Sequence, residues 1–90
     1  MSATIHLPGV LATLAGTSSL ETKAGTLGEV VADVRERHPR LGPRLCDTGG
    51  RPHSFIAFFV NAVDARSTGG MTAPVHDGDI ITIVSAIAGG

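Results

Sequence analysis

Apolar and polar residues alternate in two short runs near the beginning of the chain. Residues 3–7 alternate until a Pro-Gly pair, and residues 20–24 alternate until a glycine. Between them, residues 15–19 are rich in Gly, Ser and Thr, a composition that suits a turn. The pattern predicts two strands, which run antiparallel if they pair with each other.

The next stretch changes to a helical period. Thr26 and Glu29 have the spacing of a capping box, in which each side chain bonds to the backbone of the other residue. Four apolar residues at i, i+3, i+4 and i+7 then form one stripe: Leu27, Val30, Val31 and Val34. Because Pro39 restricts the residue before it, the helix is expected to end near His38. Residues 41–45 are expected to add one further turn.

The second half of the chain contains two strongly apolar runs. Residues 55–60 are apolar on both faces, which is typical of a strand inside a sheet. Residues 80–84 are rich in β-branched side chains and predict the last strand. Residues 64–66 are expected to form a short edge strand. Loops and turns are expected at residues 47–53, 67–76 and 77–79.

This order of elements predicts an α+β fold of the β-grasp type, a mixed sheet with one main helix packed on one face. The first and last strands are expected to lie parallel in the centre, and the other face of the sheet to stay open. We expect residues 1–85 to form the β-grasp domain and residues 86–90 a flexible C-terminal tail ending in Gly-Gly.

Composition limits what such a chain can do. Ninety residues make one domain, and a core with three Phe and no Trp or Tyr leaves little room for an enclosed active site. A net charge of −1 does not favour nucleic acid or an anionic membrane as a partner. No apolar run approaches the roughly 18 residues of a membrane span, and no Lys or Arg precedes Lys23 as in a signal peptide. We therefore expect a cytoplasmic protein.

Few side chains are candidates for catalysis or for binding a metal or cofactor. The four histidines have no metal-ligand spacing, and no phosphate-binding loop motif is present, so neither a metal site nor a bound cofactor is expected. Cys46, the one cysteine, follows the apolar residues Leu41 and Leu45 and is interpreted as a packing residue. A role in redox or sulfur chemistry is the alternative for Cys46.

The C-terminus is a stronger candidate for the reactive group than any side chain. From this glycine content a Gly-Gly end arises by chance in only about 2% of chains. Since glycine lacks Cβ, Gly89 and Gly90 suit a tail that threads a narrow channel to a reacting group. The carboxylate of Gly90 is then a group that another enzyme can activate.

Several short motifs are spread along the whole chain: Thr26-Leu27-Gly28, residues 55–60 followed by Asn61, Asp64-Ala65-Arg66, Gly69-Gly70, Asp77-Gly78-Asp79 and Ala88-Gly89-Gly90. By these motifs the chain resembles the ThiS/MoaD-type ubiquitin-like sulfur carriers over essentially all 90 residues, and most closely the actinobacterial branch that serves cysteine synthesis. The connection over residues 39–54, longer than in the thiamine type, favours that branch. Ser85 and Ala86 depart from the proline that relatives often have, which implies a more flexible tail.

The resemblance implies a protein co-substrate and not an enzyme. An adenylating, E1-like partner uses ATP to activate the Gly90 carboxylate, which sulfur then converts to a thiocarboxylate. In the cysteine branch the sulfur acceptor is a pyridoxal-phosphate cysteine synthase, and a zinc peptidase releases the product. Thiamine, molybdopterin and specialised-metabolite pathways use the same architecture, so the pathway stays open.

Two alternatives share these features: a protein modifier conjugated through Gly90, and a non-catalytic interaction module. For the partner-binding surface, alternation predicts that Phe59, Thr82 and Val84 lie on the open face of the sheet. We expect them to dock the adenylating enzyme together with the tail residues Ile87, Ala88 and Gly89.

Overall fold

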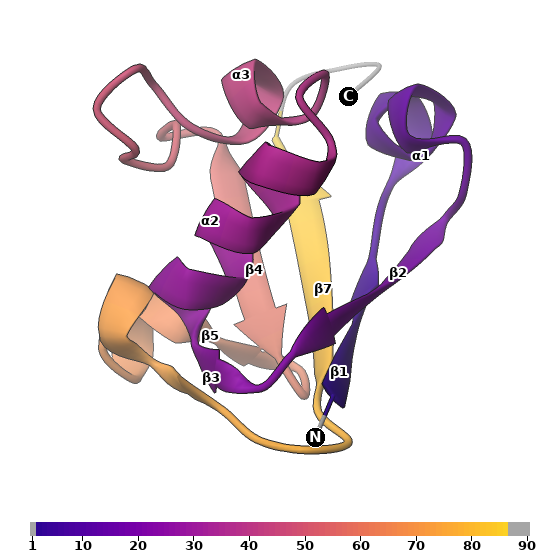
Figure 1. Cartoon of the computed structure of the whole chain (residues 1–90). Helices are drawn as coiled ribbons and strands as arrows, with labels where there is room; N and C mark the ends of the chain where they lie inside the picture. The colour runs from indigo at the N-terminus through magenta and orange to yellow at the C-terminus, as the bar shows by residue number, and fades with distance from the viewer. Residues whose placement is uncertain (1, 87–90) are drawn as a thin grey trace.

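The computed structural model describes residues 2–86, which form a five-stranded sheet with a helix across one face (Figure 1). The strand order is β2-β1-β7-β4-β5, and β1 and β7 are parallel while the other neighbours are antiparallel. The strands are β1 (Ser2–His6), β2 (Ser19–Lys23), β4 (Ile56–Val60), β5 (Val63–Asp64) and β7 (Ile80–Ser85). The mixed sheet with its parallel central pair confirms the predicted β-grasp fold.

The main helix, α2 (Leu27–Arg37), begins with the expected capping box. The Thr26 hydroxyl accepts a hydrogen bond from the Glu29 amide at 3.1 Å, and Glu29 Oε1 accepts one from the Thr26 amide at 2.9 Å. The four residues of the apolar stripe are all buried, and the helix ends at Arg37 with His38 as its C-cap. The sequence prediction is confirmed at both ends of the helix.

Alternation along β4 and β7 decides which face carries the core. Ile81 and Ile83 are buried, whereas Ile80 and Val84 are each 43% exposed. Ile56 and Phe58 are buried under α2 in the same way. The face of the sheet opposite α2 therefore presents the alternate side chains to solvent, as predicted.

A short helix that the sequence analysis did not predict connects β1 to β2. This helix, α1 (Gly9–Ala15), begins after Pro8, whose side chain cannot accept a hydrogen bond. It ends at Gly16, whose φ of 76° lets its amide bond back to the carbonyls of Ala12 and Thr13. The helix has seven residues, no side-chain cap and no charged face, so its sequence carries little helical signal. Leu11 is buried and packs the helix against the core.

The prediction of a short edge strand over residues 64–66 is wrong for the last two of these residues. Only Asp64 belongs to β5, and Ala65 and Arg66 begin a 3₁₀ turn, η1 (Ala65–Ser67). The Asp64 carboxylate accepts a hydrogen bond from the Arg66 amide at 3.0 Å, and this cap turns the chain out of the sheet. The Arg66 guanidinium, bonded to the Asp64 side chain, also lowers the pKa of that carboxyl.

The remaining elements are short. A turn of helix, α3 (Gly42–Leu45), lies where one further turn was expected, and η2 (Gly70–Thr72) follows η1. A second, two-stranded sheet joins β3 (Gly25–Thr26) to β6 (Pro74–Val75). The longest helix within residues 2–86 is α2, with 11 residues, so no helix in this part of the chain could span a bilayer.

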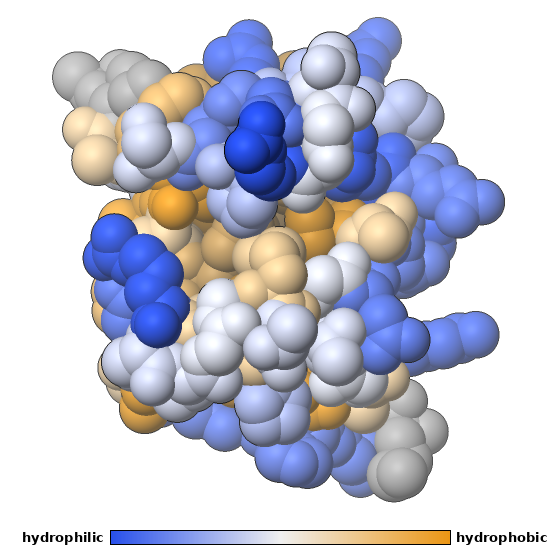
Figure 2. All heavy atoms as spheres, turned by 90° about the vertical axis from the view of Figure 1, so that its left-hand side faces the viewer, coloured by the Kyte–Doolittle hydropathy of each residue, from blue (hydrophilic) through white to orange (hydrophobic). Residues whose placement is uncertain are grey.

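Because β5 is so short, the outer edge of β4 is only partly covered by the described residues. A groove of about 370 Å³ lies there, lined by apolar residues that include Leu27, Ile56, Phe58 and Met71. Figure 2, which looks at this side of the molecule, shows an apolar hollow between two polar rims.

Candidate functional site: the open face of the sheet and the end of β7

One row of side chains crosses the open face of the sheet. Phe59 on β4 lies directly opposite Thr82 on β7 and Asp64 on β5. Thr82 is in turn the partner of His6 on β1. This row runs from an imidazole to an ion-paired carboxylate, with the Phe59 ring between them. Within this row the Phe59 ring therefore lies between Thr82 and Asp64.

Val84 extends this row towards the end of β7. Its direct partner on β4 is Ala57, so Phe59 is its diagonal neighbour on the same face. Phe59 is half-buried, and it lies on the opposite side of β4 from the core residue Phe58. The structure thus brings Phe59, Thr82 and Val84 together on one surface, which we call the open-face patch. Their role in binding a partner stays a prediction.

The backbone ladder between β4 and β7 continues one residue beyond Ser85. The Ala86 amide donates a hydrogen bond of 2.9 Å to the carbonyl of Phe55, so the first residue of the expected tail is tied to the sheet. The other tail candidates, Ile87, Ala88, Gly89 and Gly90, lie outside the described residues. Sequence analysis missed this role of Phe55, because strand register is set by long-range pairing and not by the local pattern.

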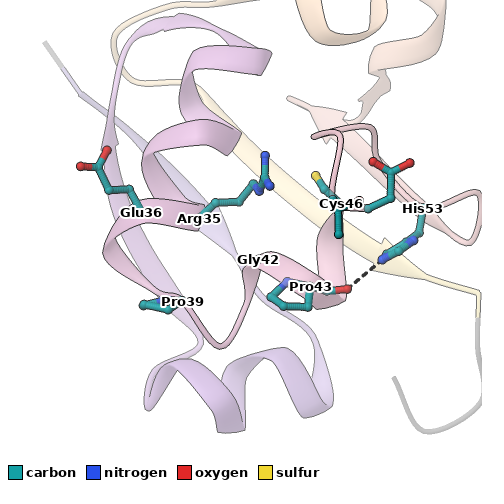
Figure 3. Close-up of a pocket in the computed structure, with 9 residues that line it drawn as sticks. Arg35, Glu36, Pro39, Gly42, Pro43, Cys46 and His53 are labelled. Atoms are coloured by element: carbon teal, nitrogen blue, oxygen red, sulfur yellow. Dashed lines mark hydrogen bonds between the residues drawn. The ribbon is translucent and has the colours of Figure 1, made fainter.

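Cys46 lies in the floor of a separate pocket, of about 700 Å³, between α2, α3 and the loop that follows. The thiol is buried, and burial raises the pKa of Cys46 although the nearby Arg35 guanidinium opposes the shift. Figure 3 shows the side chain of Arg35 pointing towards Cys46. A buried thiol with a raised pKa is mostly protonated at neutral pH, which favours the packing interpretation over a nucleophile.

The contacts of His53 are with neighbouring residues and stabilise the local structure. His53 Nε2 lies 2.7 Å from the carbonyl oxygen of Pro43 (Figure 3). The His53 ring also stacks on Phe55, with 5.0 Å between the ring centres. Within residues 2–86, no three His, Cys, Asp or Glu side chains form a group that could hold a metal ion.

The fold defines a ubiquitin-like β-grasp protein whose last strand, β7, lies in the middle of the sheet. The model of the ThiS family matches residues 5–90. The chain is 34% identical over 93 residues to the sulfur carrier protein CysO of Mycobacterium tuberculosis and of Mycobacterium bovis, with 100% of both chains covered. The chain belongs to the ThiS family.

Solved structures agree with this assignment. The crystal structure of Mycobacterium tuberculosis CysO matches with a TM-score of 0.84 and 32% identity over 94% of this chain and 99% of that one. A chain in the Amycolatopsis orientalis BexX/CysO complex matches with a TM-score of 0.86 and 40% identity, over 98% and 99% of the two chains. The small archaeal modifier protein 1 of Methanosarcina acetivorans has a TM-score of 0.89 over 99% and 96%, but at 21% identity it shares the fold alone.

Proposed function

We propose that this chain is a sulfur carrier, acted on by other enzymes as a co-substrate, whose reactive group is the carboxylate of Gly90. The observation that carries the proposal is the full-length similarity to CysO in a chain that also ends in Gly-Gly. The position of β7 supports it, because the central strand leads directly to the last residues.

The proposed chemistry has two steps. In the first, a Gly90 carboxylate oxygen attacks the α-phosphorus of ATP, and pyrophosphate leaves. In the second, sulfide attacks the carbonyl carbon of the acyl-adenylate, AMP leaves, and a thiocarboxylate remains. Activation is needed because a carboxylate is inert to nucleophiles, whereas a mixed anhydride has a good leaving group.

In this proposal the carrier holds neither the nucleotide nor any cofactor. The adenylating enzyme binds ATP and docks on the open-face patch, where Phe59 and Val84 supply an apolar surface beside the strand that leads to Gly90. Because activation consumes ATP, we place the reaction in the cytoplasm.

For the sulfur acceptor we propose a pyridoxal-phosphate cysteine synthase, followed by a zinc peptidase that releases the product. The similarity to CysO proteins supports this branch. Thiamine, molybdopterin and specialised metabolites are the competing destinations, and a BexX/CysO complex is known from Amycolatopsis orientalis. Conjugation to other proteins is less well supported, since the likeness to an archaeal modifier extends only to the fold.

Pyrophosphate release tests the first step. The adenylating enzyme from the same organism is mixed with ATP, with and without the carrier, and pyrophosphate is measured. We expect release that depends on the carrier and is lost when Gly90 is removed. Carrier-independent release, or equal release with the shortened carrier, would contradict activation at Gly90.

A further inference from the structure

A second surface flanks the end of β7, on the side away from the open-face patch. A cleft of about 130 Å³ lies between α1 and α3, which Figure 1 shows at the same end of the sheet. It is lined by Val10 from α1, by Pro43 and Arg44 from α3, by Phe55 just before β4, and by Ser85 at the end of β7. At about 30 Å³ per water, this volume corresponds to roughly four waters, which is the size of one apolar side chain.

Arg44 gives this cleft a positive rim. Its side chain is exposed and makes neither an ion pair nor a hydrogen bond with any residue from 2 to 86. None of the described residues that line the cleft is acidic. A partner that places an apolar side chain in the cleft and a carboxylate beside it would complement both the shape and the charge.

The short chain beyond Ala86 limits how far from this cleft an enzyme that acts on Gly90 can bind. Ala86 is fixed to the carbonyl of Phe55, a lining residue, and four residues separate it from the end of the chain. At about 3.3–3.6 Å per residue, the Gly90 carboxylate reaches at most about 14 Å from Ala86. An enzyme that encloses this carboxylate must therefore approach the surfaces on both sides of Ala86.

We propose that the adenylating enzyme docks in this cleft as well as on the open-face patch, with an apolar side chain against Val10 and Phe55 and an Asp or Glu against Arg44. The inference rests on the proposed function, since it assumes that such an enzyme acts on Gly90. It adds a second, charge-selective contact in a cleft that sequence analysis did not locate, because α1 was not predicted.

Four variants test the proposal by titration against the adenylating enzyme of the same organism. Arg44→Glu should weaken binding about tenfold, with a smaller difference at high salt, and Arg44→Lys should restore most of the affinity. Val10→Thr keeps the shape of the side chain but buries a hydroxyl, and should cost at least about fivefold. Lys23→Glu is the charge control. Lys23 lies opposite Ser2, at the end of the sheet where β7 begins, whereas the cleft lies at the end where β7 finishes.

A control for the apolar contact is Val63→Thr on the exposed edge strand β5, which should bind like wild type. Wild-type affinity for folded Arg44→Glu and Val10→Thr, in a carrier that the enzyme still thiocarboxylates, would overturn the cleft proposal alone. If the wild-type carrier is neither bound nor modified, the proposed function fails and this inference fails with it. If Lys23→Glu and Arg44→Glu lose equal affinity, the effect depends on the overall charge of the carrier, and a specific contact at Arg44 is contradicted.

Discussion

Phe59 lies directly opposite Thr82 across the ladder between β4 and β7, with Val84 as its diagonal neighbour on the same face. The alternation of buried residues places α2 on the other side of the sheet. An aromatic ring is therefore held on a rigid strand beside the strand that leads to Gly90. We therefore propose Phe59 as the anchor for a partner that acts on the C-terminus.

We expect Phe59→Ala to weaken binding of the adenylating enzyme at least tenfold. Truncating an aromatic anchor in an interface typically costs about 2 kcal/mol or more, and about 1.4 kcal/mol corresponds to tenfold. The measurement is a binding titration, with circular dichroism to verify the fold. Val63→Ala, at an exposed apolar residue outside the patch, is the matched control. Unchanged affinity of a folded Phe59→Ala variant would refute the patch.

Replacing the buried cysteine should leave the chemistry intact. We expect Cys46→Ala to be thiocarboxylated like wild type, because Cys46 is 2% exposed and burial raises the pKa of its thiol. Loss of the sulfur atom from the core should lower the free energy of unfolding by about 1 kcal/mol, measured in urea. A folded variant that cannot be thiocarboxylated would assign Cys46 a role in sulfur transfer.

Asp79 should make stability depend on pH in acid. Its carboxylate accepts hydrogen bonds of 2.8 Å from the His76 amide and from the Asn61 side chain, and these bonds lower the pKa of Asp79. Since the folded-state pKa lies below the unfolded value of about 3.9, the stabilisation is complete above that pH. It is lost as the pH falls through the folded-state value.

Asp79→Asn is therefore expected to be less stable than wild type by about 1 kcal/mol at pH 7 and to show a weaker loss of stability in acid. Urea unfolding at several pH values between neutrality and strong acid measures both effects. Glu36→Gln, which removes an exposed carboxylate without a described hydrogen bond, is the control. The interpretation would be wrong if both variants kept the acid dependence of wild type.

The sequence predicted the elements whose signals are local. Thr26 and Glu29 mark the start of α2 through their own side chains, and the alternation in β7 gives the buried face directly. The same alternation placed Phe59 on the open face. These features depend on the period of the chain and on contacts between near neighbours.

Features that depend on distant partners were not predicted. The helix α1 is held by the burial of Leu11 and has no side-chain N-cap that a sequence pattern would reveal. The bond from Ala86 to Phe55 depends on the register of two strands that are far apart in the chain. The cleft beside Arg44 needs both features, so it could only emerge from the structure.

The central claim is that the Gly90 carboxylate is the group that carries sulfur. Its most direct test is the intact mass of the carrier after incubation with ATP, the adenylating enzyme and sulfide. We predict that the mass rises by the difference between one sulfur and one oxygen atom, and that a carrier lacking Gly90 stays folded but keeps its mass. An unchanged mass of the full-length carrier, with an enzyme shown to be active, would contradict the account.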